Sequence, residues 1–299
     1  MKRVVITGAT GAVGTALINE LLEKDVEILV LVWREIADKH LFPQNPLLTV
    51  VPCSLDELNS FDNPTDQPYE VFYHLAWAGT TGAGRDDMFL QCDNIRYALD
   101  AVALAKRMGC SKFVGVGSQA EYGRVSGKLT ADTPAFPEMG YAYGKLCAGL
   151  MTRDLAHQIG LEHVWTRILS IYGPMDTPNS LIMSTILKLQ SGEIPKLTPG
   201  EQKWDYLFSG DAAKALRLLG EKGIDGKTYV LGSGKTRTIR EYVEAIRDIV
   251  SPGAPLDFGG IPYSPKQVMY LCADTTDLEN DLGWHAETSF ELGIKTIIA

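Results

Sequence analysis

Three residues in the middle of the chain carry functional groups suited to proton and hydride transfer. Tyr141 and Lys145 stand four positions apart at the start of a helical pattern, so both lie on one face of that helix. An ammonium near a phenol stabilises the phenolate, and we therefore expect Lys145 to lower the pKa of Tyr141. Ser118 follows a short buried run, which places its hydroxyl at the carboxyl edge of a sheet. The three predict proton exchange with a carbonyl during hydride transfer.

The first sixteen residues predict the nucleotide site that such a hydride requires. A β-branched run at 4–6 is typical of a buried strand, glycines follow at a spacing of three, and an apolar helical pattern begins at Ala16. A strand, a glycine turn and a helix in this order direct backbone N–H groups and the positive helix end at a phosphate. The spacing G-x-x-G-x-x-G is one residue longer at the front than the usual dinucleotide fingerprint. We expect a nucleotide cofactor to contact Gly8, Thr10, Gly11, Ala12, Val13 and Gly14.

Alternating strand and helix patterns must position these groups. A long helix is predicted over 88–108, with an apolar stripe that includes Leu90 and Leu99. Elements of these lengths, alternating along the chain, imply right-handed crossovers and a parallel sheet with both faces covered. The fold class is therefore α/β, with a doubly wound, Rossmann-type parallel sheet. Further strands are predicted at 26–32, 47–52, 71–76, 112–116 and 164–170.

The strand ends bear on which nucleotide binds. In an NAD-binding unit the tip of the second strand usually carries an Asp or Glu for the ribose 2′-OH. Here Leu31 and Val32 stand at the tip and Arg34 follows. A missing carboxylate and a nearby guanidinium favour a 2′-phosphate, hence NADP(H), with NAD(H) and a surface arginine as the alternative. After the fourth strand, the backbone is expected to approach the cofactor at Leu75, Ala76 and Ala78.

Composition excludes several classes of protein. The chain has 299 residues, a net charge of −9 and ordinary apolar content, which suits one large α/β domain or two unequal ones. This charge argues against a nucleic-acid-binding surface. The five cysteines include no C-x-x-C pair, as expected of reduced thiols in a cytosol, and we expect no metal site. No signal peptide or membrane-spanning segment is visible, so we expect a soluble cytoplasmic protein.

With these motifs in place, the sequence resembles the extended short-chain dehydrogenases/reductases of the NAD-dependent epimerase/dehydratase family, which act on nucleotide-diphosphate sugars. The resemblance implies that Ser118, Tyr141 and Lys145 form a catalytic triad. Tyr141 would donate or accept the proton, Ser118 would hydrogen-bond the sugar oxygen, and Lys145 would hold the nicotinamide ribose. Asn94 would belong to the cofactor site. The resemblance covers nearly the whole chain and is carried by TGATGAVG, HLAWAG, Asn94, GSQAEYG, YAYGK, IYGP, WDYLFSGDAA and CADTTDLENDLGW.

Departures from the family pattern favour one reaction. Sugar 4,6-dehydratases of the family carry an acidic pair directly after the catalytic hydroxyl residue, or a hydroxyl residue and then Glu, to eliminate water. Gln119 and Ala120 stand at these positions in this chain. Glu121 instead matches the S-x-x-E-Y-G form of 4-keto-6-deoxy-sugar reductases. We therefore expect NADPH-dependent reduction of the 4-keto group of a nucleotide-diphosphate 4-keto-6-deoxy sugar. The alternatives are an NAD-dependent nucleotide-sugar 4-epimerase and, from another class, a non-catalytic NADP(H) sensor.

The resemblance also implies a smaller C-terminal α/β domain that binds the nucleotide sugar. It would comprise 171–204 plus about 223–299, including a strand at 228–231, and leave 1–170 plus about 205–222 to the cofactor domain. Relatives usually have Asn in place of Ser170 and Arg in place of Trp204. We further expect a homodimer through the helices that begin near Met88 and Tyr141. The expected substrate contacts are Ser118, Gln119, Ser170, Asn179, Trp204 and Lys266.

Overall fold

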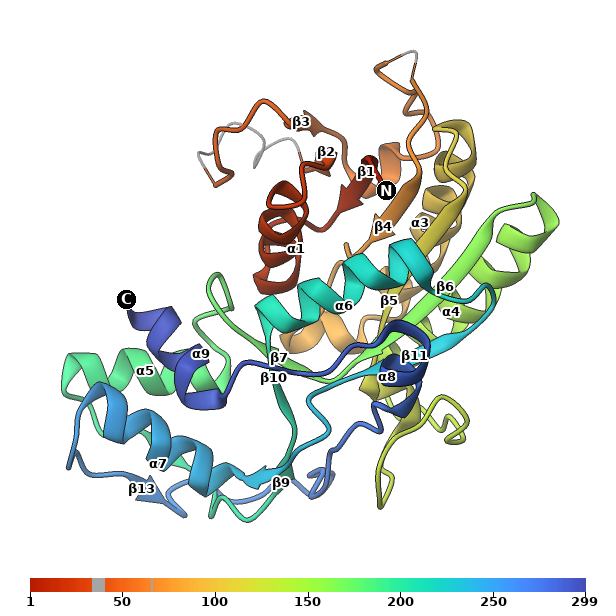
Figure 1. Cartoon of the computed structure of the whole chain (residues 1–299). Helices are drawn as coiled ribbons and strands as arrows, with labels where there is room; N and C mark the ends of the chain where they lie inside the picture. Colours follow the sequence, from red (N-terminus) through yellow and green to blue (C-terminus); the bar gives the residue numbers. More distant parts are fainter. Residues whose placement is uncertain (34–40, 66) are drawn as a thin grey trace.

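A seven-stranded parallel sheet forms the centre of the computed structural model, which describes residues 1–33, 41–65 and 67–299 (Figure 1). The strand order is β11-β6-β5-β4-β1-β2-β3, and every neighbouring pair is parallel. This confirms the doubly wound parallel sheet that the alternating pattern predicts. Its strands are β1 (Arg3–Thr7), β2 (Glu27–Val32), β3 (Leu48–Pro52), β4 (Val71–His74), β5 (Lys112–Ser118), β6 (Glu162–Ile168) and β11 (Thr228–Leu231).

Helices cover both faces of this sheet because its strands present apolar side chains alternately to either side. Val4 and Ile6 of β1 join one buried cluster, and Val5 joins the cluster on the opposite face. Helices α1 (Ala12–Leu22), α6 (Ser209–Lys222) and α8 (Thr276–Leu282) lie over the first cluster. Helices α3 (Met88–Arg107) and α4 (Gly140–Gln158) pack against each other on the other face (Figure 1).

A second part of the chain is built from helices and very short strands around an aromatic cluster. Tyr206 meets Tyr242 edge to face, with the ring centroids 5.0 Å apart, and Phe290 packs against Tyr242 at 4.6 Å. The helices are α5 (Leu181–Ser191), α7 (Ile239–Val250) and α9 (Phe290–Ile298), which lie together at the lower left of Figure 1. The short strands are β8 (Lys196–Leu197), β9 (Lys203–Trp204), β12 (Arg237–Thr238) and β13 (Asp257–Phe258).

The chain passes repeatedly between the two parts. Strands β7 (Ser170–Tyr172) and β10 (Tyr206–Phe208) pair in parallel beyond the end of the large sheet. The assignment of 228–231 to the smaller domain was wrong, because β11 pairs with β6 at the edge of the large sheet. A short apolar strand reaches whichever sheet edge is open, and its own sequence does not say which. The rest of the domain division remains a prediction.

Helix α4 packs on the sheet over the indole of Trp165 in β6. A Cβ at Gly149 of α4 would lie 2.7 Å from Cε2 of this indole, and a Cβ at Gly115 of β5 would lie 2.5 Å from Cε3. Real Cβ atoms are not found so close to such neighbours, so the indole fills the space that the two glycines leave. This packing brings the first turns of α4 against the carboxyl end of β5.

Candidate active site

Lys145 of α4 lies buried against the end of β5. Its Nζ donates a hydrogen bond to the carbonyl oxygen of Val116 at 2.6 Å and lies 4.0 Å from the centre of the Trp77 ring. Burial lowers the pKa of Lys145 to about 7, and the negative charge of Glu121 opposes this shift. The side chain is thus bound to the sheet, and its amino group gains or loses a proton near neutral pH.

Tyr141 lies one helical turn before Lys145, as the spacing predicts. The prediction that Lys145 lowers the pKa of Tyr141 is wrong for this structure, where burial raises it. The neighbours that lower this pKa are the hydroxyl of Ser118 and the guanidinium of Arg85, while Glu121 raises it. Lys145 does not act on the phenol because its Nζ turns to the Val116 carbonyl. The spacing therefore gave the correct face of the helix but not the direction of the ammonium.

Ser118 ends β5 and begins the short 3-10 turn η3 (Gln119–Tyr122). Its backbone N–H donates to Oε1 of Glu121 at 2.8 Å, which closes a capping box. Glu121 is fully buried, and its Oε2 accepts a hydrogen bond from Nε of Arg167 at 2.7 Å. The Trp165 indole donates to the same carboxylate at 3.2 Å. The buried carboxylate of Glu121, which is itself paired with Arg167, thus fixes the backbone of Ser118.

The glycine turn has the backbone that a phosphate site needs. Gly8 has a φ of +77°, and a Cβ there would lie 2.6 Å from the carbonyl carbon of Leu75. Gly11 is the N-cap of α1 and has extended backbone. No atom of the described residues beyond its chain neighbours lies within 4 Å of an ideal Cβ at Gly11, so an anion has free access to the N–H groups of the helix. These residues fit a dinucleotide phosphate.

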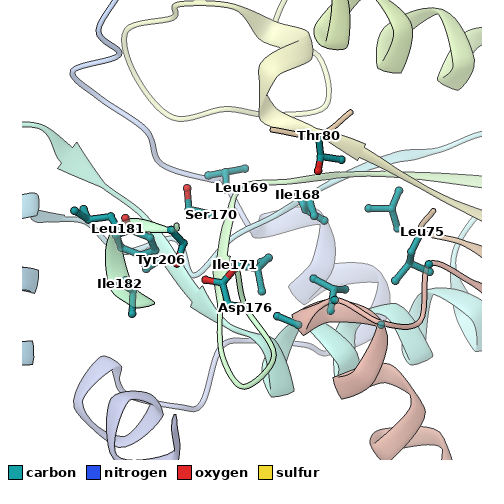
Figure 2. Close-up of a pocket in the computed structure, with 17 residues that line it drawn as sticks. Leu75, Thr80, Ile168, Leu169, Ser170, Ile171, Asp176, Leu181, Ile182 and Tyr206 are labelled. Atoms are coloured by element: carbon teal, nitrogen blue, oxygen red, sulfur yellow. The ribbon is translucent and has the colours of Figure 1, made fainter. Parts of the chain in front are cut away.

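Two cavities meet at this turn, and Gly8 lines both. The first has a volume of about 480 Å³ and is also lined by Gly11, Ala12, Val13, Gly14 and Leu75. Figure 2 shows Leu75 on one side of this space and Ser170, Leu181 and Tyr206 of the second part on the other. The second cavity, of about 550 Å³, is lined by Thr10, Ala76 and Ala78 and by the end of β2. Cavities of this size accommodate a cofactor and a small substrate.

The remaining cofactor predictions have different outcomes. Asn94 is buried in α3, where its side-chain amide bonds both backbone groups of Ala78 at 2.9 Å. In this structure Asn94 therefore holds the chain segment after β4, and its contact with a cofactor stays a prediction. Val32 is buried at the tip of β2 and Trp33 beyond it is exposed. Arg34 lies outside the residues that the structure describes.

The structure brings together two of the predicted substrate residues. Trp204 donates its indole N–H to the hydroxyl of Ser170 at 2.7 Å, and both line a further cavity of about 340 Å³ in the second part. Gln119 lies in η3 directly after Ser118. Asn179 and Lys266 are exposed, and their contact with a substrate stays a prediction.

Two residues of the site were missed by sequence reasoning. Arg85 lies in the 3-10 turn η2 (Gly82–Asp86), with its Cζ 4.6 Å from the centre of the Tyr141 ring. Trp77 meets the same phenol ring edge to face at 6.2 Å. Trp77 stands inside the HLAWAG motif, which was a signal for it, whereas the glycine-rich segment around Arg85 gave none. A further 3-10 turn, η1 (Leu55–Glu57), contributes Leu55 to the second cavity.

The sheet, the glycine turn before α1 and the Ser-Tyr-Lys set at the carboxyl edge together define an extended short-chain dehydrogenase/reductase. Residues 4–232 match the model of the NAD dependent epimerase/dehydratase family. The chain belongs to this family. Within the described part, no helix is long and apolar enough to cross a membrane. The same residues contain no group of three or more His, Cys, Asp or Glu side chains suited to hold a metal ion.

Curated relatives include sugar-nucleotide enzymes of more than one reaction. The chain is 31% identical over 201 residues to dTDP-glucose 4,6-dehydratase of Xanthomonas campestris, a match that covers 63% of this chain but only 57% of that protein. It is 24% identical over 309 residues to CDP-abequose synthase of Salmonella muenchen, with 100% of this chain and 97% of that protein covered.

Solved structures share the fold over the whole chain. A UDP-N-acetylglucosamine 4-epimerase from Methanobrevibacter ruminantium, in complex with UDP-N-acetylmuramic acid, superposes with a TM-score of 0.87 at 21% identity, covering 99% of this chain and 98% of that one. A UDP-glucose 4-epimerase from Thermotoga maritima, with UDP-glucose, gives 0.85 at 19% identity, covering 99% and 97%. At these identities the likeness concerns the fold.

Proposed function

We propose that the protein reduces the 4-keto group of a nucleotide-diphosphate 4-keto-6-deoxy sugar with NADPH. The observation that carries this choice is the position of Glu121. A 4,6-dehydratase needs a free acid beside the catalytic hydroxyl residue, and Gln119 and Ala120 have no carboxyl group. The carboxylate of Glu121 is fully buried and engaged with Arg167, so it is not available to remove a proton from a substrate.

The residues of the site have separate roles in this proposal. The reduced nicotinamide, when bound, supplies a hydride to the carbonyl carbon. Tyr141 donates its phenolic proton to the carbonyl oxygen, which completes the hydroxyl group and leaves a phenolate. Ser118 hydrogen-bonds the same oxygen and holds it within reach of Tyr141. Lys145 binds the ribose of the nicotinamide with the N–H donors that its bond to the Val116 carbonyl leaves free.

The preference for NADPH is supported by the end of β2. Val32 and Trp33, the described residues at this strand end, carry no carboxylate, which is the group that NAD-specific sites use there for the ribose 2′-OH; the carboxylate that lines the same cavity belongs to Asp56 of η1. We propose that Arg34 binds the 2′-phosphate. We also propose that the cavity beside Ser170 and Trp204 receives the nucleotide of the substrate. Lys266 and Asn179 are proposed as further substrate contacts.

The experiment is a reductase assay with a panel of nucleotide-activated 4-keto-6-deoxy sugars. We expect loss of NADPH absorbance with at least one of them and formation of a 4-hydroxy product. The variant Tyr141→Phe removes the proton donor and should lower the rate by a factor on the order of a hundred or more. If Tyr141→Phe instead keeps the full function of the wild-type protein, the protein senses the cofactor NADP(H) and does not catalyse a reaction.

The second candidate is an NAD-dependent nucleotide-sugar 4-epimerase. The family description names NAD, and both solved structures reported above are 4-epimerases. An epimerase returns the hydride to the opposite face of the sugar and keeps its cofactor. We would assign the epimerase reaction in place of the reductase if the purified protein retains NAD⁺ and interconverts two 4-hydroxy sugars without a net change in absorbance.

We also propose a homodimer through the outer faces of α3 and α4. Large apolar side chains are exposed there on both helices, and Phe89, for example, has 86% of its surface accessible. The others are Met88, Tyr143, Leu150 and Met151. Light scattering during gel filtration should give twice the chain mass, and a single-chain mass would refute the dimer.

A further inference from the structure

Arg85 stacks on the ring that donates the proton. Its Cζ lies 4.6 Å from the centre of the Tyr141 ring, within the range of a cation–π contact. Its Nε is buried and, among the residues that the structure describes, has no hydrogen-bond partner. A buried N–H without a hydrogen-bond partner costs folding free energy. Such a group in a native structure therefore calls for an explanation, and a role in the site provides one.

The turn that carries Arg85 is held in place from several sides. Gln91 of α3 donates from Nε2 to the carbonyl oxygen of Gly84 at 2.7 Å. On the other side of Arg85, Asp86 accepts a hydrogen bond from the backbone N–H of Gly140 at 3.3 Å. A Cβ at Gly140 would lie 2.9 Å from the carbonyl oxygen of Arg85. The turn is therefore docked on the first residue of α4, directly before Tyr141.

The other charged groups near Tyr141 do not replace Arg85. Lys145 is directed to the Val116 carbonyl and the Trp77 ring. Glu121 of η3 raises the pKa of the phenol, and Asp86 of η2 is bonded to the backbone of α4. In the described part of the chain, Arg85 is the cation found in contact with the phenol ring.

We propose that Arg85 is a positioning residue for proton transfer: its guanidinium holds the Tyr141 ring and stabilises the phenolate that forms when the proton leaves. The proposal deepens the proposed reductase and depends on it for the reaction, but the effect on the phenol exists without substrate. It differs from the expectation that Lys145 is the partner of the phenolate. The Arg85 charge lowers the pKa of Tyr141, in agreement with this role.

The consequences for catalysis follow from the charge. During reduction Tyr141 transfers its proton to the carbonyl oxygen, and the resulting phenolate faces a fixed guanidinium until a proton from solvent restores the phenol. Without Arg85, the phenolate is less stable and the proton is held more tightly. The rate plateau should fall, and the alkaline limb of the pH profile, where Tyr141 loses its proton, should move to higher pH.

The test is a titration of Tyr141 that needs no substrate. Protein labelled with ¹³C at the tyrosine ζ carbon is titrated by NMR, and the signal of residue 141 is identified as the one missing in Tyr141→Phe. We expect Arg85→Gln to raise the midpoint of this signal by about one pH unit, the size of a partly desolvated cation–π contact. Arg85→Lys keeps the charge in a less planar group and should give a smaller shift.

The matched control is Arg3→Gln. Arg3 begins β1, at the end of the strand opposite the carboxyl edge, and stacks on Tyr69 with its Cζ 4.3 Å from the ring centre. The Arg3→Gln variant should leave the Tyr141 midpoint and the pH profile of the reductase unchanged. An unchanged Tyr141 midpoint in folded Arg85→Gln overturns the proposal. If the Gln variant does not fold, Arg85→Met removes the same charge, and an unchanged midpoint there overturns the proposal as well. If Arg85→Gln shifts the Tyr141 midpoint but the wild-type protein reduces no keto-sugar, the role of Arg85 toward the phenol is supported. The proposed reductase reaction is then refuted.

Discussion

Replacing Lys145 by methionine should reveal how much stability the site costs the protein. Lys145 is buried, and its pKa in the folded chain is about 7, against 10.5 for an ordinary lysine. Burial therefore destabilises the folded state whenever the ammonium is charged. Methionine has a similar volume and no charge, so Lys145→Met should abolish reduction while making the protein more stable near neutral pH.

The sign and the size follow from proton linkage. Between pH 7 and 10.5 the unfolded chain binds a proton at Lys145 that the folded chain has released, so the free energy of unfolding rises with pH in this range. Each pH unit is worth up to about 1.4 kcal/mol. From pH 6 to pH 9 the wild-type protein should gain about 2.6 kcal/mol from this group, and Lys145→Met should lack that gain.

The measurement is urea unfolding of both proteins at pH 6, 7, 8 and 9. Other groups titrate in both proteins, so their contributions cancel in the difference between the two curves. The exposed Lys24, substituted to methionine, controls for the loss of a lysine in general and should follow the wild type. Parallel curves for wild type and Lys145→Met would refute the reasoning, because they would mean that Lys145 has the same pKa in the folded and unfolded chain.

Three further substitutions concern the glycine turn and the buried ion pair. Gly8→Ala forces a side chain into a left-handed backbone and should destabilise the fold by at least about 1–3 kcal/mol, seen as a lower Tm. Gly11→Ala should unfold like the wild type but bind NADPH more weakly in a fluorescence titration, since its Cβ points into open space. Glu121→Gln leaves Arg167 buried without a charged partner, which should cost about 3–5 kcal/mol in urea unfolding. The same change removes the charge that raises the pKa of Lys145, so that pKa should fall further.

Local patterns predicted the elements of this protein well. Helix α3 occupies 88–107 where the apolar stripe predicted a helix over 88–108, and Asp87 caps its first turn by accepting from the N–H groups of Phe89 and Leu90. The strands β1 to β6 were found from apolar runs. All except the edge strand β3 are mostly buried, and strands buried on both faces are apolar throughout. Ser118, Tyr141 and Lys145 were selected from their spacing and from their place after a strand, and their catalytic role stays a prediction.

The missing parts depend on contacts between distant segments. Arg85 precedes Tyr141 by more than fifty positions, and only the docking of its turn on Gly140 brings the two together. The edge position of β11 depends on its pairing with β6, which cannot be predicted from the residues of either strand. The direction of the Lys145 ammonium was missed because it is decided by a backbone carbonyl of β5, and backbone groups leave no trace in residue types.

The indole of Trp165 has a consequence for how this protein can change in evolution. It occupies the space above Gly115 and beneath Gly149, two positions that belong to different elements and lie far apart in the chain. A methyl group at either glycine is tolerated only if residue 165 shrinks, and a smaller residue 165 leaves a void unless the glycines grow. We therefore expect related chains to exchange these three positions as a set, and the distance of the lysine helix from the sheet to vary with that set.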